Sequence, residues 1–210
     1  MGIDLSVQTL GGAEMDELTV AAYDSRPESF AETWHTQSAP TELHDLVRRF
    51  FHPGRPTADI GCGAGRDTAW LTGNGYPAIG YDPSIGLLTE AGRRHPGIDF
   101  RCDSLPDLNS IADASLANVL CETVIMHLQP RDIASSVGRL VNILCPGGIL
   151  YLSWRVADSC RRDDHGRLYS AVDEQQVLGA LGSAVVRFSD QQISGSSGAS
   201  IHTVIAERVA

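Results

Sequence analysis

One segment limits more than any other what this chain can fold into: the run Asp59-Ile60-Gly61-Cys62-Gly63-Ala64-Gly65, which lies between a short apolar stretch and a helical one. Glycines spaced in this way at the end of a strand let the backbone approach a ligand closely, because any Cβ atom would obstruct it. Open parallel sheets bind ligands at the carboxyl ends of their strands. The segment therefore predicts a strand-turn-helix unit of an α/β sheet, with a nucleotide-like cofactor at the turn.

The spacing of these glycines distinguishes between two classes of cofactor, dinucleotides and S-adenosylmethionine. A dinucleotide fingerprint is G-x-G-x-x-G, whereas this chain has G-x-G-x-G with Asp59 two residues before the first glycine. A carboxylate beside a pyrophosphate is unfavourable, but one near the cationic amino group and sulfonium of S-adenosylmethionine is favourable. The spacing favours S-adenosylmethionine, and an NAD-dependent oxidoreductase stays open as the alternative.

The rest of the chain from about residue 57 alternates short apolar or β-branched runs with helical stretches, which is typical of a parallel sheet flanked by helices. A short Gly/Ser loop at 194–198 joins the last two runs, and so short a return favours antiparallel pairing. We expect a Rossmann-like α/β fold: a seven-stranded, mostly parallel sheet with helices on both faces and an antiparallel C-terminal hairpin. Strands are predicted at 58–61, 78–81, 98–102, 116–121, 149–154, 184–189 and 202–207, and helices at 67–72, from Ser84, from Pro130 to about Leu144, and at 173–181.

The first 50 residues carry no clear strand signal. Residues 42–51 are predicted to be helical, because Leu43, Leu46, Val47 and Phe50 fall on one face. We expect an N-terminal helical cap or lid over residues 1–50 and a Rossmann-like domain over 51–210, forming together one compact unit, since 210 residues fit one domain better than two.

Four ordered motifs resemble those of the class I S-adenosylmethionine-dependent methyltransferases: residues 59–65, 80–84, 102–105 and 144–148. The resemblance covers about residues 55 to 155 and implies an enzyme whose cofactor is S-adenosyl-L-methionine. It implies that Asp82, with Pro83 next to it, accepts hydrogen bonds from the ribose hydroxyls. The other cofactor contacts that it implies are Asp59, Gly61, Cys62 and Gly63 at the methionine part, Asp103, Ser104 and Leu105 at the adenine, Cys121 and Glu122 at the fourth strand, and Tyr23 over the methionine end.

The residues after the fourth predicted strand narrow the class of methyl acceptor. Methylases of DNA bases and protein amides carry an Asn/Asp-Pro-Pro-aromatic motif there, which Cys121-Glu122-Thr123-Val124 does not match, and no acidic set typical of magnesium-dependent methylases is evident. We expect no metal. His127-Leu128 is similar to the small-molecule group with a helical cap, which methylates N, O, S or C nucleophiles, including those of secondary metabolism.

Side chains for the acceptor pocket come from the cap and from the loop after Trp154. The candidates are His127, Glu122 and Arg155 for catalysis, and Trp34, His35, Arg155 and His165 for substrate contact. A structural histidine is an equal alternative for His127, and simple packing is one for Trp34 and His35. Arg66 and Asp67 are interpreted as an ordinary first-turn pair, and residues 158–166 as a solvated polar loop.

Composition limits the partners and the compartment. A formal net charge of -10, with basic residues gathered only in pairs, argues against a nucleic-acid partner. No apolar stretch approaches the roughly 20 residues that cross a bilayer, so we expect no membrane span. Five widely spaced cysteines without C-x-x-C pairing indicate reduced thiols and a cytoplasmic protein. The sequence leaves three points open: the oligomeric state, the acceptor, and whether the chain binds S-adenosylmethionine without catalysing methyl transfer.

Overall fold

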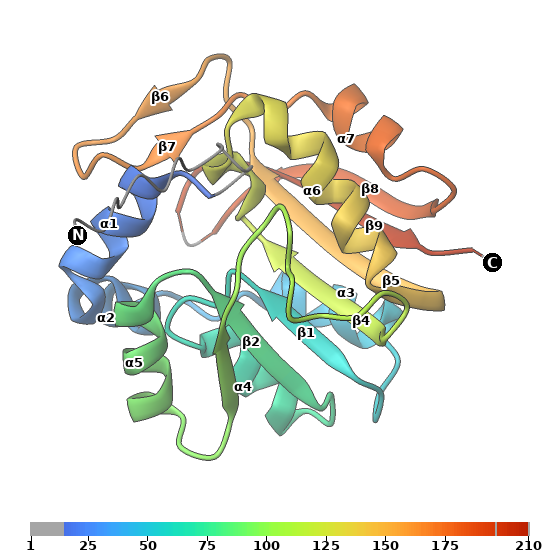
Figure 1. Cartoon of the computed structure of the whole chain (residues 1–210), viewed down its shortest axis with the longest axis horizontal. Coiled ribbons are helices and arrows are strands. Elements are labelled where there is room, and N and C mark those ends of the chain that lie inside the picture. The colour runs from blue at the N-terminus through green and yellow to red at the C-terminus, as the bar shows by residue number, and fades with distance from the viewer. Residues whose placement is uncertain (1–14, 196, 210) are drawn as a thin grey trace, which may run out of the picture.

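The computed structural model describes residues 15–195 and 197–209, and its main feature is a seven-stranded sheet in the order β3-β2-β1-β4-β5-β9-β8 (Figure 1). Strands β1 to β5 pair in parallel, while β9 is antiparallel to both of its neighbours. The predicted fold, including the C-terminal antiparallel hairpin, is confirmed. The strands are β1 (Thr57–Ile60), β2 (Ala78–Asp82), β3 (Asp99–Cys102), β4 (Leu116–Glu122), β5 (Leu144–Arg155), β8 (Val185–Ile193) and β9 (Ser200–Glu207).

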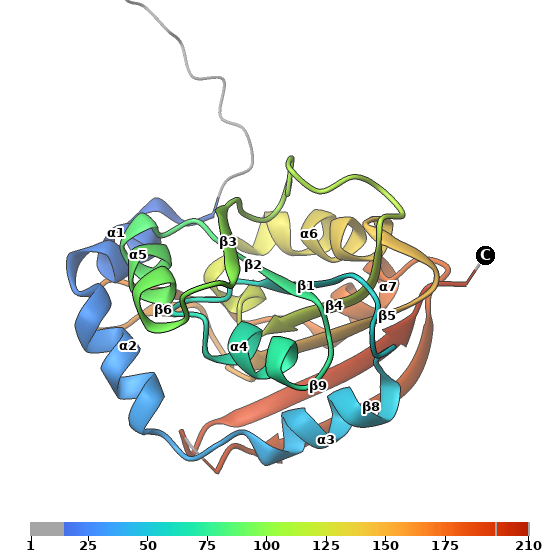
Figure 2. The same ribbon diagram turned by 90° about the horizontal axis from the view of Figure 1, so that it is seen from below.

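Helices cover both faces of this sheet (Figure 2). On one face lie α3 (Thr41–Phe50) and α4 (Arg66–Gly73), and on the other α6 (Pro130–Asn142) and α7 (Glu174–Ala180). Successive residues of β5 point to opposite faces, so Tyr151 packs in one buried cluster and Leu152 in the other. Among the described residues, no helix is both long and apolar enough to cross a membrane.

Helix α5 (Ile85–Arg94) begins where the sequence predicts. The side chain of Ser84 caps it by accepting a hydrogen bond from the amide of Leu87 at 3.1 Å. Ser84 also donates its hydroxyl to Asp24 Oδ1 at 2.6 Å, and Asp24 belongs to helix α1 (Glu17–Ser25). This hydrogen bond ties helix α1 to the segment between β2 and α5.

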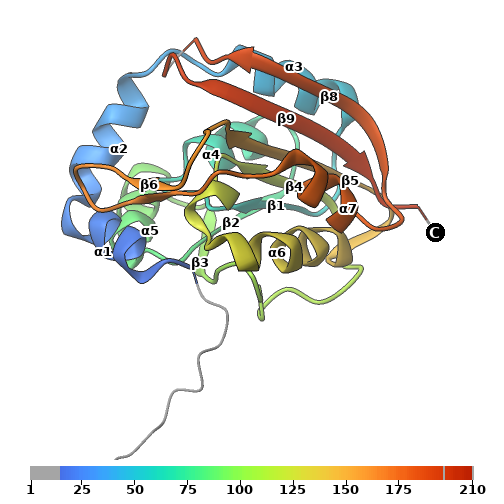
Figure 3. The same ribbon diagram turned by 90° about the horizontal axis from the view of Figure 1, so that it is seen from above.

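The cap consists of α1 and α2 (Pro27–Thr36), which lie beside α5 and a small hairpin of β6 (Arg161–Arg162) and β7 (Leu168–Tyr169) (Figure 3). Helix α3, by contrast, buries Leu43 and Val47 against the sheet. We propose that the cap comprises α1 and α2 rather than all of residues 1–50, of which 1–14 lie outside the described residues. The hairpin corrects the expectation of a loop at 158–166: each of its strands is too short to leave a periodic signal.

A second difference concerns the end of α6. The sequence predicts that the segment 145–148 ends this helix, but α6 stops at Asn142 and Leu144 already pairs with Leu116. The strand register then shifts before Ile149 pairs with Asn118, so the Pro-Gly-Gly segment forms an irregularity within β5.

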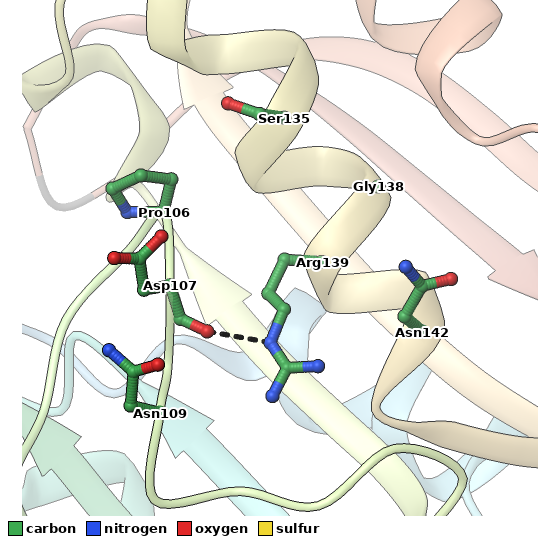
Figure 4. A pocket seen from close by; sticks show the side chains of 7 residues that line it. All are labelled: Pro106, Asp107, Asn109, Ser135, Gly138, Arg139 and Asn142. Carbon is green, nitrogen blue, oxygen red and sulfur yellow. Dashed lines mark hydrogen bonds between the residues drawn. The ribbon is translucent and has the colours of Figure 1, made fainter. Parts of the chain in front are cut away.

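A hollow of about 360 Å³ lies between α6 and the loop that connects β3 to β4 (Figure 4). Arg139 crosses it and donates from Nε to the carbonyl of Asp107 at 2.7 Å and from Nη2 to the carbonyl of Leu108 at 3.0 Å. These hydrogen bonds satisfy carbonyl groups of the loop and hold it to α6, so the hollow is explained by the packing of the loop on the helix.

Candidate functional site

A cavity of about 790 Å³ opens at the carboxyl ends of the parallel strands. Its walls come from the glycine turn after β1, the ends of β2, β4 and β5, the cap helices and the β6–β7 hairpin. This is the position at which open α/β sheets bind ligands.

Two glycines of the turn are required by its geometry. Gly61 has a φ of +74°, and a Cβ there would lie 2.3 Å from Val124 Cγ2. Gly63 has a φ of +55°, and a Cβ there would lie 2.9 Å from the indole of Trp34, which reaches the turn from α2. Any side chain would thus meet both an unfavourable φ and a neighbour, so the turn exposes bare backbone beneath the cap.

Asp82, at the end of β2, lines the cavity and has a fixed carboxylate. Its Oδ2 accepts from the amide of Gly63 at 2.9 Å, and its Oδ1 accepts from the amide of Ser84 at 2.9 Å. Burial raises the pKa of Asp82 to about 6, although both backbone hydrogen bonds act to lower it. Each carboxylate oxygen keeps a further lone pair, so the group can also accept from two hydroxyls of a ligand.

A second acidic region lies where α4 and β4 meet the turn. Arg66 donates to both carboxylate oxygens of Asp67, at 3.0 and 2.9 Å. Burial, and then the negative charge of Asp67, raise the pKa of Glu122, while Arg66 lowers it. Asp67 is paired with Arg66, whereas Glu122 feels that guanidinium only through space, so two acids share the charge of one arginine and the region favours a cationic ligand group.

Tyr23, His127 and Arg167 form a connected chain of hydrogen bonds on the opposite wall. Nδ1 of His127 lies 2.6 Å from the carbonyl oxygen of Leu168, which can only accept, so Nδ1 carries the proton. Nε2 is then an acceptor, and the hydroxyl of Tyr23 donates to it at 3.2 Å. Arg167 Nη1 donates to the same hydroxyl oxygen at 3.3 Å.

Burial controls the protonation of this chain. It lowers the pKa of His127 to about 4, helped by the charges of Arg167 and Arg155. Burial also raises the pKa of Tyr23 to about 12. At neutral pH both groups are therefore uncharged, with a neutral imidazole whose basic nitrogen is directed at Tyr23.

The central part of the sequence is similar to known methyltransferases. Residues 58–152 match the family model described as "Methyltransferase domain". A ubiquinone biosynthesis O-methyltransferase of Bradyrhizobium sp. is 31% identical over 99 residues, which are 45% of this chain and 38% of that protein. A trans-aconitate 2-methyltransferase of Methylobacterium nodulans is 31% identical over 131 residues, 60% of this chain and 47% of that protein. The chain thus spans less than half the length of these relatives.

Solved structures share the fold over most of the chain. The 1,6-didemethyltoxoflavin-N1-methyltransferase of Burkholderia thailandensis superposes with a TM-score of 0.73 at 18% identity, covering 100% of this chain and 99% of that one. The [4+2]-cyclase SpnF gives a TM-score of 0.72 at 14% identity, covering 95% of this chain and 99% of that one. The segment matched by the family model, residues 58–152, runs from β1 to β5 of this fold and includes the glycine turn and Asp82.

Residues 58–152 are thus similar in sequence to a methyltransferase domain, and the chain shares its fold with solved methyltransferases.

Most of the residues predicted for the site line this cavity, and their contacts with a ligand stay predictions. They come from α1, α2, the turn, and the ends of β2, β4 and β5: Tyr23, Trp34, His35, Gly61, Cys62, Gly63, Asp82, Pro83, Glu122, His127 and Arg155.

Other predicted residues are placed away from the cavity wall. Asp59 is buried behind the turn, where it accepts from the hydroxyl of Thr68 at 2.6 Å, and burial raises its pKa to about 8. Cys121 is buried in the core because its side chain points to the opposite side of β4 from the neighbouring Glu122. The geometry therefore favours an indirect role of Asp59 and Cys121, in supporting the turn and β4.

The three residues predicted at the adenine also do not line the cavity. Asp103 accepts from the amides of Ser104 and Ser110, each at 2.8 Å, and so shapes its own loop. Leu105 is fully buried in the core. His165 is exposed and lies with its ring centroid 5.7 Å from that of Phe30, outside the cavity.

Several residues that line the cavity are not evident from the sequence. The sequence indicates an ordinary first-turn pair for Arg66 and Asp67, yet both line the cavity. Arg167 and Tyr169 also line it, although they come directly after a charged segment that is typical of a solvated loop. The available signal was the apolar pair Leu168-Tyr169 beside an arginine.

Proposed function

We propose that this protein binds S-adenosylmethionine at the β1–α4 turn and transfers its methyl group to a small molecule held beneath the cap. The observation that carries this proposal is the continuity of the cavity. One space joins the bare backbone of Gly61 and Gly63 and the carboxylate of Asp82 to the wall formed by Tyr23 and His127.

The residues present fit the cofactor. Asp82 offers two acceptor oxygens, already oriented by backbone amides, to the ribose hydroxyls. The turn offers room that a Cβ at Gly61 or Gly63 would fill. Burial and Asp67 raise the pKa of Glu122, and a cationic amino group bound there would favour its ionised form. S-adenosylmethionine, when bound, supplies an electrophilic methyl group on a sulfonium.

The cap side supports proton removal from an acceptor. A proton leaving the acceptor can pass to Tyr23 Oη as the Tyr23 proton passes to Nε2 of His127. Nδ1–H of His127 remains bonded to the carbonyl of Leu168, which offsets in part the burial and the arginine charges that disfavour the imidazolium, and Arg167 stabilises negative charge that develops on the tyrosine oxygen. The cap helices and the hairpin line this region of the cavity.

The acceptor atom is left open by the relatives, whose names specify an O-methyltransferase, a trans-aconitate 2-methyltransferase and an N1-methyltransferase. We propose a small organic acceptor and no nucleic acid, because the net charge of -10 would repel a phosphate backbone.

Isothermal titration with S-adenosylhomocysteine tests the cofactor, and transfer of label from methyl-tritiated S-adenosylmethionine to a metabolite extract tests the reaction. We expect saturable binding of one equivalent and a labelled small product. Folded protein that binds no S-adenosylhomocysteine, or that enhances NADH fluorescence instead, would reverse the proposal in favour of an oxidoreductase.

A second function has one specific support: SpnF, a structure with the same fold, is described as a cyclase. A fold alone does not establish an activity. Binding of S-adenosylhomocysteine without any transfer of label would favour such a non-methylating protein.

A further inference from the structure

Three arginine side chains surround one tyrosine ring at the cap end of the cavity. The guanidinium carbons of Arg155, Arg161 and Arg167 lie 5.5, 5.4 and 5.7 Å from the ring centroid of Tyr169. Tyr169 is itself buried in β7. Such a concentration of positive charge is unexpected on a chain with a net charge of -10, and it calls for a negative partner.

A comparison of the ion pairs made by the arginines that line the cavity shows which guanidinium lacks a negative partner. Four arginines line the cavity in the described part of the chain, and three of them have a carboxylate within hydrogen-bonding range: Arg66 with Asp67 at 2.9 Å, Arg94 with Glu90 at 3.2 Å and Arg167 with Asp163 at 2.6 Å. The side chain of Arg155 makes no ion pair and no hydrogen bond among the described residues. Its guanidinium lies over the ring of Tyr169, and its charge reaches Glu122, whose pKa it lowers, only through space. Its N–H donors are therefore available to a ligand.

The position of Arg155 relates these donors to the proposed reaction. Arg155 is the last residue of β5, two residues after Ser153, which pairs in register with Glu122 at the end of β4. It lines the same cavity as Tyr23 and His127, and its charge is close enough to lower the pKa of His127. A group bound by Arg155 is thus held near the proton-accepting wall.

Part of the cavity wall is apolar or aromatic. Met15, Val20 and Met126 line the cavity beside Tyr169. The cation–π contact with Tyr169 helps to position the Arg155 guanidinium, whose planar pair of N–H donors matches the two-oxygen geometry of a carboxylate. A single unpaired guanidinium within the cavity also balances a single negative charge.

We propose that the methyl acceptor is an organic acid and that Arg155 binds its carboxylate, with the apolar body of the acid facing Met126 and Val20. This inference rests on the proposed methyltransferase function, and it names the substrate class of that site. Arg155 is then the residue that determines specificity for acids.

Methyl transfer to fractionated metabolites tests the substrate class directly. A small-molecule extract of the source organism is separated by anion exchange at pH 7 into retained and unretained pools. Portions of the retained pool are treated either with carbodiimide and methylamine, which converts carboxylates to amides, or with alkaline phosphatase. We expect label from methyl-tritiated S-adenosylmethionine in the retained pool, lost after amidation and unaffected by phosphatase.

The other outcomes overturn the inference in distinguishable ways. Transfer to the unretained pool, or loss of transfer after phosphatase, shows a methyltransferase whose acceptor is not a carboxylic acid. No transfer to either pool by protein that binds S-adenosylhomocysteine contradicts the proposed function itself, and the inference with it.

Variants of Arg155 test the residue once a labelled pool is found. Arg155→Met should raise the apparent KM for that pool by about 10- to 100-fold, the scale of losing hydrogen bonds to a charged group, while S-adenosylhomocysteine binding is unchanged. Arg155→Lys should recover part of the affinity, because it restores the charge but not the paired donors. Arg131→Met, at an 81% exposed side chain outside the cavity, is the matched control. An unchanged KM in Arg155→Met would refute the assignment.

Discussion

The hydroxyl of Tyr23 lies 3.2 Å from Nε2 of His127, so a residue of the cap closes a hydrogen-bonded chain that begins in the sheet domain 104 residues later. The proton on Nδ1 of His127, bonded to the carbonyl of Leu168, leaves Nε2 able only to accept. The cap is therefore part of the proposed chemistry, in addition to covering it.

Replacing Tyr23 with phenylalanine removes the hydroxyl that joins His127 to Arg167. We expect kcat for methyl transfer to fall by about 100-fold, which is typical of losing a positioned proton-transfer group, with S-adenosylhomocysteine affinity within about threefold of wild type. Steady-state kinetics and titration calorimetry measure the two effects. Tyr76→Phe, in the buried cluster on the α3 and α4 face, is the control and should leave kcat unchanged. Equal kcat values for the two variants would exclude the proton-transfer role.

The glycine turn predicts a steric effect that can be reversed. A Cβ at Gly61 would lie 2.3 Å from Val124 Cγ2 and would sit on a residue with a φ of +74°. Gly61→Ala should destabilise the fold by about 1–3 kcal/mol and weaken S-adenosylhomocysteine binding. Adding Val124→Ala should restore part of the stability, because it removes the clashing methyl groups but not the backbone strain. Chemical denaturation measures both steps.

The control for this pair is Gly73→Ala in α4, where the added Cβ meets nothing within 4 Å. It should be neutral or stabilise the fold by up to about 1 kcal/mol, because alanine favours a helix over glycine. If Gly61→Ala behaved like Gly73→Ala, the turn would not have the conformation described.

The order of strands and helices along the chain could be predicted because most of the strands, β1, β2, β4, β5 and β9, contain a buried apolar run. Asp82 could be predicted for the same reason, since it is the last residue of such a strand, where parallel sheets form their sites. The hairpin of β6 and β7 could not, because two-residue strands have no period, and Arg161-Arg162 is typical of a solvated charge pair.

The placement of the remaining site residues depends on contacts that the sequence does not encode locally. Asp59 belongs to the glycine motif, yet its orientation is set by Thr68, nine residues away on α4. Arg167 enters the site because Tyr23 and Asp163 hold it from two different elements. Contacts of this kind between distant residues follow from tertiary packing and cannot be predicted from a local sequence pattern.

The β6–β7 hairpin is held to the cap by an ion pair whose removal should loosen it. Arg162 donates to both oxygens of Asp16, at 2.7 and 2.8 Å, and these bonds lower the pKa of Asp16 to about 2. This stabilisation is present above the unfolded pKa of 3.8 and is lost as the pH falls towards 2. Arg162→Met should therefore speed amide exchange in β6 and β7 at pH 7.

Hydrogen-deuterium exchange of the amides of 161–169 measures this loosening, and global stability should change little, because Arg162 is partly exposed. Arg101→Met, which removes the exposed pair with Asp99, should leave hairpin exchange unchanged. Exchange that is identical in the two variants would mean that the pair does not hold the hairpin.

The buried carboxyl of Asp59 should make the stability of the protein depend on pH. Burial raises its pKa from 3.8 to about 8, so between these values the folded chain holds a proton that the unfolded chain releases. The contribution of this group to stability is therefore complete below about pH 3.8 and is lost as the pH rises through 8.

Asp59→Asn keeps the shape and an acceptor for Thr68 but removes the titration. We expect a higher Tm than wild type at pH 8, a smaller difference at pH 5, and unchanged Tm values in a parallel Asp45→Asn control at an exposed residue. Scanning calorimetry at the two pH values measures these Tm values. An Asp59→Asn protein that is less stable than wild type at pH 8 would contradict the prediction, because it would mean that Asp59 is ionised and stabilising.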